Sequence, residues 1–190
     1  MTLQPSLFEP APVLPEGMRY EAGFISPAEE REMADAIARL PLTPFQFRGF
    51  EGKRRTASFG RHYDFNAGGL REAEPMPAFL LAVRSRAAEL AGLAADRLQH
   101  ALVIEYGKGA GIGWHRDRPV FGDVVGISLL SPCTLRFRRK QGSRWERLSL
   151  TAAPRSAYLL TGGARTEWEH SIPAVETLRY SVTFRSLKQP

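Results

Sequence analysis

The pattern of apolar and polar residues divides the chain into a helical first part and a strand-rich second part. Residues 18–25 have the composition of a short strand. Ser26 begins a predicted helix, because Pro27 suits the first helical position and Glu29 completes a capping box. Apolar residues then recur at helical spacing until Pro41, which ends the predicted helix.

A second helix is predicted over residues 77–90, where apolar side chains again follow the helical period. From residue 96 onward, short apolar runs alternate with turn residues, which is typical of an antiparallel sandwich or barrel. Between these regions, residues 44–66 are rich in aromatic and basic side chains and predict short strands and exposed loops. We therefore expect an α+β chain with N-terminal helices and a β-rich core.

The composition is that of one folded domain, since 190 residues with 43% hydrophobic and 24% charged content suit a single core. We expect residues 1–17, which are rich in proline, to form a flexible arm, and residues 18–190 to form the domain. The net charge of +6 suits a polyanionic partner such as nucleic acid, although a basic surface also serves solubility. A lone cysteine, Cys133, and the lack of a signal-like start or membrane-length apolar run predict a cytoplasmic protein.

The stretch His115-Arg116-Asp117 carries the strongest chemical signal. In an extended segment, residues i and i+2 point to the same side, so His115 and Asp117 can chelate one ion. His170 could complete the site from another strand. Two histidines and one carboxylate leave open metal positions, as in non-haem Fe(II) oxygenases. The His-x-Asp pair alone is explained better by a surface turn with a satisfied histidine.

Arginines at both ends of the last predicted strand strengthen the metal interpretation. Arg179, Ser181 and Arg185 share one strand face by the same period of two. Two arginines on an inward face need anions, and guanidinium groups pair well with the carboxylates of an organic diacid. The alternative is an exposed edge strand with solvated arginines. A zinc hydrolase could also use two histidines and one aspartate, but it leaves the arginines unexplained.

Three segments together, G-I-G-W-H-R-D, W-E-H-S-I-P and R-Y-S-V-T-F-R, resemble the AlkB family of Fe(II)- and 2-oxoglutarate-dependent dioxygenases. The resemblance covers most of the chain. It implies a double-stranded β-helix, the jelly roll of two facing antiparallel sheets, with its core over about residues 98–187. It also implies Fe(II), 2-oxoglutarate and O2 as the cofactors. The implied Fe(II) ligands are His115, Asp117 and His170. The implied cosubstrate residues are Tyr106, Arg179, Ser181 and Arg185.

The chain departs from the family pattern at three positions. The family often has asparagine where this chain has Ile104 and Ser181, so one cosubstrate hydrogen bond is expected to be missing and another shortened. We expect binding to survive, because charge-assisted contacts are the stronger ones. Pro119 stands where some members have an acidic residue near the substrate base, so the base preference does not carry over.

Residues 44–66 resemble the nucleotide-recognition lid of the family. A base treated at a buried metal must leave its stack, and aromatic faces replace the lost stacking. The implied substrate residues are Arg54, Phe59, Tyr63, Phe65 and Arg118. The alternative is that the aromatic members are core residues of an N-terminal strand. Trp114 and Arg165 are expected beside the site in packing or structural roles, and a basic hairpin over residues 136–144 could hold a second strand or be a solvated turn.

The resemblance implies oxidative demethylation of alkylated bases in DNA or RNA, as in alkylation damage repair, by a monomer. The products would be succinate, CO2 and formaldehyde. Two alternatives stay open: a hydroxylase or demethylase of protein side chains, and a catalytically silent nucleic-acid-binding module. The sequence does not distinguish DNA from RNA or one alkylated base from another.

Overall fold

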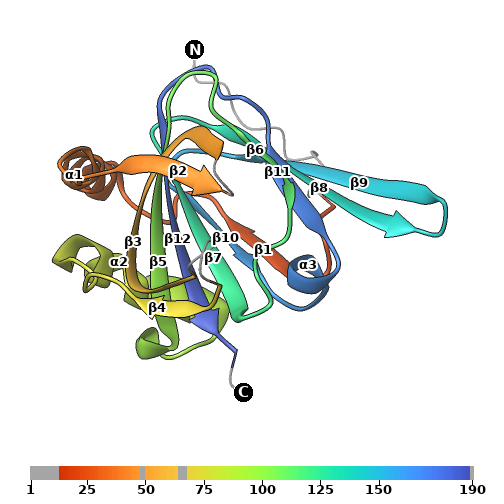
Figure 1. Cartoon of the computed structure of the whole chain (residues 1–190), viewed down its shortest axis with the longest axis horizontal. Coiled ribbons are helices and arrows are strands. Elements are labelled where there is room, and N and C mark those ends of the chain that lie inside the picture. The colour runs from red at the N-terminus through yellow and green to blue at the C-terminus, as the bar shows by residue number, and fades with distance from the viewer. Residues whose placement is uncertain (1–12, 48–49, 64–67, 189–190) are drawn as a thin grey trace, which may run out of the picture.

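Two antiparallel β-sheets form the framework of the molecule in the computed structural model, which describes residues 13–47, 50–63 and 68–188 (Figure 1). The larger sheet runs in the order β1 (Met18–Glu21), β10 (Ser156–Leu160), β7 (Phe121–Leu129), β12 (Arg179–Leu187), β5 (Leu98–Tyr106), β3 (Phe50–Tyr63) and β2 (Thr43–Phe47). A short eighth strand, β4 (Leu70–Glu72), pairs with β3. The smaller sheet runs in the order β6 (Ile112–His115), β11 (Glu169–Ile172), β8 (Cys133–Gln141) and β9 (Arg144–Ala152).

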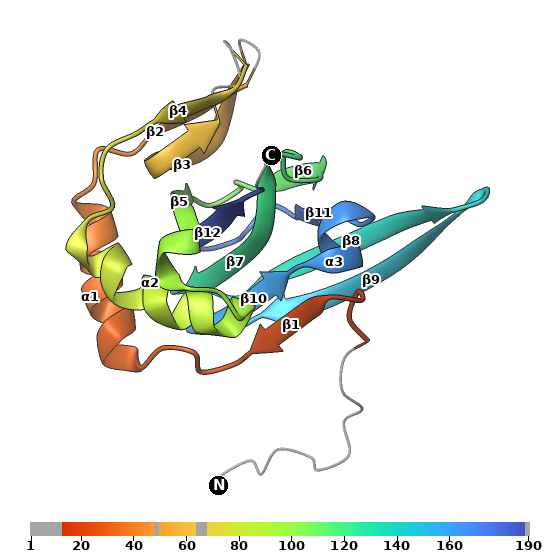
Figure 2. The same cartoon turned by 90° about the horizontal axis from the view of Figure 1, so that it is seen from below.

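The two predicted helices are present and cover one face of the larger sheet. Helix α1 (Pro27–Ala38) begins at Ser26, where the capping box is formed in both directions. Helix α2 (Ala78–Ala91) ends at Gly92, which is in the left-handed region. Figure 2 shows both helices on the same side of the sheet. Two short helical segments, η1 (Ala95–Arg97) and α3 (Gly162–Thr166), complete the described elements.

Strand β12 separates two hydrophobic cores by its alternating side chains. Tyr180, Val182 and Phe184 pack into the core beneath α1 and α2. Arg179 and Arg185, at alternate positions, are buried on the opposite face, which looks toward the smaller sheet. The predicted division of this strand into an apolar packing face and an arginine-bearing inward face is therefore confirmed.

The second core fills the space between the two sheets. The larger sheet contributes side chains such as Tyr106 and Tyr158, and the smaller sheet contributes Leu135, Phe137 and Ile172. The arginine-bearing face of β12 borders this same space. Arg179 and Arg185 therefore lie between the sheets, next to apolar side chains.

Strand β3 corrects the prediction of short strands and loops over residues 44–66. It is one strand of 14 residues that pairs with β5 of the larger sheet, so this region is an extension of the sheet. Gly60 interrupts its alternation with φ +75°, and an added Cβ there would meet the carbonyl oxygen of Gln99. At Gly60 the pairing with β5 ends, and from Arg61 onward β3 pairs with β4.

Strands β8 and β9 form a long hairpin that projects away from α1 and α2 in both views (Figures 1 and 2). Its base is held by β11, which pairs with β8 through Glu169, His170 and Ser171. In the part of the chain that the structure describes, no helix has the length and apolar character required to cross a bilayer.

Candidate metal centre and cosubstrate pocket

The two predicted histidine ligands lie opposite each other on adjacent strands of the smaller sheet. His115 ends β6, and β11 places His170 directly across from it. The centroids of the two imidazole rings are 4.2 Å apart. Asp117 follows β6, and its Oδ2 lies 3.8 Å from Nε2 of His170. The structure thus brings all three predicted ligands together.

The surroundings keep these groups in the protonation states that a metal ion needs. Burial, followed by the neighbouring His115, lowers the pKa of His170 to about 3, so its imidazole is neutral. Burial also lowers the pKa of His115, whose Nδ1 bonds the carbonyl oxygen of Gly113 at 2.9 Å and leaves Nε2 for a ligand. Burial alone would raise the pKa of Asp117, but Arg185 and the histidines bring it well below its ordinary value. Two neutral nitrogens and one carboxylate are a donor set that fits Fe(II).

Asp117 is held by Arg185. The guanidinium donates from Nε and from its second terminal nitrogen to Oδ1 of Asp117, each at 2.8 Å. His115, Asp117 and His170 are thus neighbours, although among the described residues no three histidine, cysteine or acidic side chains already have the arrangement of a metal-bound group. Asp117 Oδ2, which lies toward His170, is the oxygen that this arrangement leaves for a metal.

Arg179 has the surroundings of an anion-binding residue. Its side chain is fully buried, and its Nε donates to the Ser128 hydroxyl at 3.1 Å, but neither terminal nitrogen has a hydrogen-bond partner in the part of the chain that the structure describes. The guanidinium lies 4.9 Å from the ring centroid of Tyr106, the residue across from it on β5. A buried, unpaired guanidinium is costly unless an anion satisfies it. A carboxylate of 2-oxoglutarate fits this site, because it can accept both free N–H groups at once.

A cavity of about 950 Å³ lies between the sheets, with the three metal-binding residues and Tyr106 in its wall; Arg179 contacts the ring of Tyr106 but is not itself among the lining residues. Metal-centre residues, Ser181 and Arg185 of β12, and side chains of β2 and β3 all line it. Ile104 lies in its wall as an apolar side chain, so the amide expected at this position in the family has no counterpart here. The cavity has room for both a small diacid and a larger substrate group.

Tyr158 of β10 is a cavity residue that the sequence interpretation missed. Its register partner on β7 is Gly126, and a Cβ at Gly126 would collide with the tyrosine ring. Burial raises the pKa of Tyr158, and the charge of nearby Arg179 opposes this effect. The neutral phenol is therefore available as a hydrogen-bond donor near Arg179. A glycine across from a tyrosine on the neighbouring strand indicates that the ring lies over the glycine. The sequence alone does not show that Gly126 and Tyr158 are partners, because it does not give the strand register.

His100 of β5 is a second residue that the sequence interpretation missed. It is buried, lines the cavity and receives a hydrogen bond from Arg185 at its Nδ1, 3.3 Å away. Its ring stacks on Phe121 with the centroids 5.0 Å apart. His100 thus fixes the side of Arg185 that faces away from Asp117.

The residues predicted for substrate binding divide into three groups. Arg54 and Tyr63 line the cavity, with Arg54 over the ring of Phe45 at 4.5 Å and Arg118 over the ring of Tyr63 at 5.2 Å. Phe59 is corrected: it is buried in the core beneath the helices and is not among the cavity residues. Phe65 lies outside the described residues.

The break at Gly60 explains this division. Before it, the even-numbered residues Arg54, Thr56 and Ser58 face the cavity, whereas Phe59 faces the core. Beyond it, the odd-numbered Tyr63 faces the cavity. The shared parity of the aromatic residues in the sequence therefore does not place them on one face.

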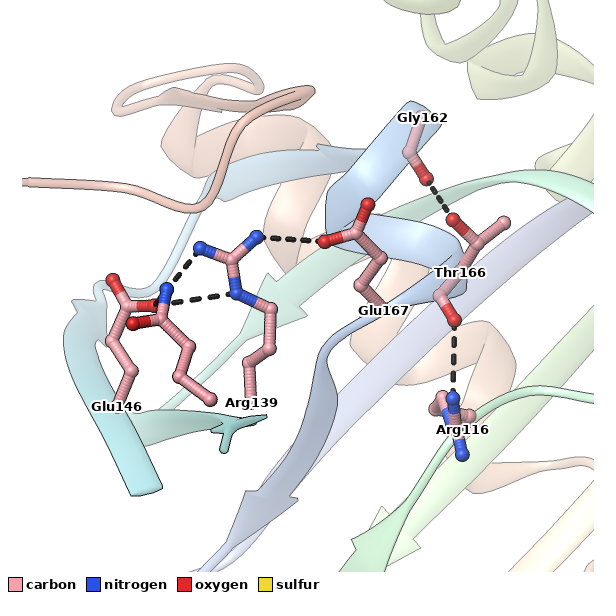
Figure 3. Close-up of polar contacts among 7 residues, drawn as sticks. Arg116, Arg139, Glu146, Gly162, Thr166 and Glu167 are labelled. Atoms are coloured by element: carbon pink, nitrogen blue, oxygen red, sulfur yellow. Dashed lines mark hydrogen bonds and ion pairs between the residues drawn. The ribbon is translucent and has the colours of Figure 1, made fainter. Parts of the chain in front are cut away.

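The two remaining predicted neighbours of the site have supporting contacts. Arg165 of α3 donates to the carbonyl oxygens of Gly122, Arg118 and Phe121, which holds the segment after Asp117 in place. Trp114 lies at the cavity wall, and the guanidinium groups of Arg136 and Arg138 lie over its ring. Figure 3 shows that α3 is also tied down by Arg116, which donates to the Thr166 carbonyl, and by the bond between Glu167 and Arg139.

A jelly roll that presents two histidines and an aspartate beside a buried arginine is typical of metal-dependent oxygenases that use a keto-acid. The sequence matches the family model described as the 2OG-Fe(II) oxygenase superfamily over residues 17–185, and the chain belongs to this superfamily. The superfamily implies Fe(II), 2-oxoglutarate and O2 as its cofactors. Within this class of dioxygenases the chain is AlkB-like, as predicted.

The relatives support the narrower assignment. The chain is 28% identical over 174 residues to a protein of Arabidopsis thaliana named "Alkylated DNA repair protein ALKBH8 homolog", which covers 79% of this chain. The chain spans about half, 49%, of the length of that relative.

Two solved structures share the fold. The structure of OsALKBH1 has a TM-score of 0.70 at 14% identity and covers 92% of this chain and 98% of its own. An oxidoreductase of the 2OG-Fe(II) oxygenase family from Burkholderia pseudomallei has a TM-score of 0.65 at 15% identity, covering 91% and 86%. These likenesses confirm the predicted jelly-roll fold.

Proposed function

We propose that this protein is a Fe(II)- and 2-oxoglutarate-dependent dioxygenase that removes alkyl groups from bases of DNA or RNA. The observation that carries the proposal is the arrangement between the two sheets of three metal-binding side chains and the buried Arg179, whose terminal nitrogens have no hydrogen-bond partner among the described residues. A cosubstrate with a carboxylate group would pair with Arg179 and so account for its burial. A hydrolytic metal site needs no such cosubstrate and leaves this arginine unexplained. The name of the Arabidopsis relative supports alkylated nucleic acid as the substrate.

The residues divide the work of the reaction between them. His115, Asp117 and His170 would hold the metal, and Arg179 with Tyr106 and Tyr158 would hold and orient the distal end of 2-oxoglutarate. With Fe(II), 2-oxoglutarate and O2 bound, the centre would supply the oxidising power to hydroxylate an N-methyl carbon, whose hydroxymethyl product releases formaldehyde and the free amine. The apolar wall between the sheets excludes bulk water from this space.

The cavity has a second end, formed by the strands that resemble the lid. Arg54, Thr56 and Ser58 of β3 face it, and Tyr63 lies beneath Arg118. An aromatic ring, hydroxyl groups and cations suit an extruded base and its phosphates. This polar aromatic end supports a nucleobase as the substrate, in preference to an aliphatic protein side chain.

A turnover screen tests the proposal. Protein loaded with Fe(II) and 2-oxoglutarate is incubated with oligonucleotides that each carry one methylated or etheno base, and mass spectrometry follows the base. We expect demethylation of at least one member of the panel, with equimolar succinate and formaldehyde, and none with His115→Ala. Binding of 2-oxoglutarate without turnover of any alkylated base would contradict the nucleic-acid assignment, and turnover of methylated peptides instead would favour a protein substrate.

A further inference from the structure

The outer face of the smaller sheet carries an unusual set of basic and aromatic side chains. Leu135 and Phe137 of β8 point into the core, so the even-numbered residues of β8 and their partners on β9 point outward. Register pairs on this outward side include Arg138 with Arg147 and Lys140 with Trp145. We call this surface the outer basic face, and its residues are Trp114, Arg136, Arg138, Lys140, Trp145, Arg147 and Glu169.

The arginines on the outer basic face are fixed by stacking. The guanidinium of Arg138 lies 4.5 Å from the ring centroid of Trp114 and 4.4 Å from that of Trp145, and its Nε donates to Glu169 at 2.6 Å. Arg136 lies over the same Trp114 ring at 5.1 Å. Trp114 also lines the cavity. The stacked series of Trp114, Arg138 and Trp145, which we call the ladder, therefore leads from the wall of the cavity onto the hairpin.

The charge of this face is not balanced within the described residues. Four cations, Arg136, Arg138, Lys140 and Arg147, share it with the carboxylate of Glu169, and the nearby Glu167 is already paired with Arg139. Lys140 and Arg147 are exposed. Trp145 is 39% exposed, although a large aromatic ring gains most from burial. Folding of the hairpin alone does not require an exposed aromatic ring beside these cations, since surface charges contribute little to stability.

We propose that the outer basic face binds the nucleic-acid strand that leads away from the catalytic cavity. The nature of the polymer rests on the proposed function. Alternate residues of β8 are about 6.8 Å apart, which is close to the spacing of successive phosphates in an extended strand. The exposed ring of Trp145 offers a stacking surface for a base at the far end of the ladder.

A nucleic acid fits this face better than an acidic peptide does. Both would neutralise the cations, but only a nucleic acid supplies flat rings that stack on Trp145 between the charges. The face also continues from the cavity wall at Trp114, so a strand whose base occupies the cavity passes directly onto it.

Binding measurements with a matched charge control test the proposal. The double variant Lys140→Ala/Arg147→Ala removes two exposed cations from the face. The control Arg31→Ala/Arg39→Ala removes one exposed cation from α1 and one from the residue that follows its C-terminus, on the other side of the molecule. Fluorescence anisotropy compares labelled single strands of about 5 and about 20 nucleotides. Loss of two phosphate contacts should lower the salt-dependence slope for the long strand by about 1.4.

We expect the hairpin variant to bind the long strand at least tenfold more weakly, to lose most of the preference for the long strand, and to bind the short strand normally. We expect Trp145→Ala to weaken long-strand binding roughly tenfold at all salt concentrations, because it removes stacking rather than charge. The α1 control should change binding less than twofold.

Equal effects of the hairpin and α1 variants would overturn the proposal, as would an equal loss for the short and long strands. Competition by polyglutamate that the hairpin variant no longer shows, with oligonucleotide binding unchanged, would assign the face to an acidic peptide. Failure of the proposed function has a different signature: long strands bind through the hairpin, but no alkylated base is turned over.

Discussion

Arg179 is the residue whose surroundings define the cosubstrate most narrowly. Its Nε donates to Ser128, its guanidinium lies against the ring of Tyr106, and its two terminal nitrogens have no hydrogen-bond partner within residues 13–47, 50–63 and 68–188. This geometry favours a ligand with a planar carboxylate group that accepts hydrogen bonds from both terminal nitrogens, and it disfavours ligands that lack such a group.

Replacement of Arg179 by Gln should therefore remove 2-oxoglutarate binding while metal binding persists. In the presence of Mn(II), saturating 2-oxoglutarate should raise the Tm of the unsubstituted protein by about 5–10 °C, because a ligand at 100 times its Kd adds about 2.7 kcal/mol. Differential scanning fluorimetry should show no such rise for Arg179→Gln. An undiminished rise in the variant would place the cosubstrate elsewhere.

Tyr158 and Gly126 act as a pair. Tyr158→Phe should keep the ring position and remove only the phenol, so we expect the KM for 2-oxoglutarate to rise roughly tenfold with little change in Tm. Gly126→Ala should displace the ring and lower both cosubstrate affinity and stability. Measurement of succinate formation as a function of 2-oxoglutarate concentration separates the two. An unchanged KM in Tyr158→Phe would show that the phenol does not contact the cosubstrate.

The sequence pointed to His115 with Asp117 and to Arg179 with Arg185 because each of these pairs lies in one short segment with a fixed period, whereas His170, 53 residues after Asp117, was assigned as a ligand through the resemblance. His115 and Asp117 are two residues apart, and Arg179 and Arg185 lie on one strand. Tyr158 and His100 could not be predicted, because their roles depend on which strands become neighbours. That pairing is determined by contacts across the whole sheet, which no local pattern encodes.

At the scale of elements, α1 does more than cover the sheet. Glu30, near its N-terminus, accepts a hydrogen bond from the backbone N–H of Leu130 at 2.8 Å and pairs with Arg155 at 3.0 Å. Leu130 and Arg155 have φ values of 69° and 62°, a conformation that costs a non-glycine residue about 1–2 kcal/mol. The Glu30 carboxylate thus stabilises two strained turns, one directly after β7 and one directly before β10.

Replacement of Glu30 by Gln should reduce the free energy of unfolding by about 1–3 kcal/mol, because one buried charged contact is lost and its partners stay in place. Glu32→Gln, on the exposed side of the same helix, serves as the control and should change stability by less than about 0.5 kcal/mol. Urea denaturation measures both. Equal midpoints for the two variants would contradict a bracing role for Glu30.

The elements were predictable to different degrees. Helix α1 was predicted correctly at its start, because the capping box is a local signal at Ser26 and Glu29. Strand β3 was wrongly predicted as separate short strands and loops, because its exposed cations and the glycine at position 60 interrupt the pattern of a buried strand. Pairing with β5 and β4 overrides that local pattern.

At the scale of the whole molecule, the buried metal centre makes the stability of the metal-free protein depend on pH. The pKa of His170 is about 3 in the folded protein and about 6.5 in the unfolded chain. Below pH 6.5 the imidazole of His170 binds a proton in the unfolded chain but stays neutral in the folded protein. The contribution of His170 to the free energy of unfolding is therefore fully present above that pH and decreases as the pH falls toward 3. The lowered pKa of His115 acts in the same direction.

The metal-free protein should therefore lose about 2 kcal/mol of stability from His170 alone between pH 6.5 and pH 5. His170→Gln should flatten this part of the profile. Urea denaturation of chelator-treated protein at several pH values gives the slope. A stability that stays level over this range would show that His170 is accessible to protons in the folded state.

The break at Gly60 has a consequence for how this protein can diverge. One side of strand β3 packs in the core and the other side lines the substrate cavity. Before Gly60 the even-numbered residues face the cavity, and beyond it the odd-numbered Tyr63 does. A deletion of one residue before Gly60 would turn Arg54 and Thr56 toward the helices, whereas a deletion after it would move only Tyr63 and the pairing with β4. We therefore expect a change of length just beyond Gly60 to disturb the core less than one before it, and to alter the substrate end of the cavity through Tyr63.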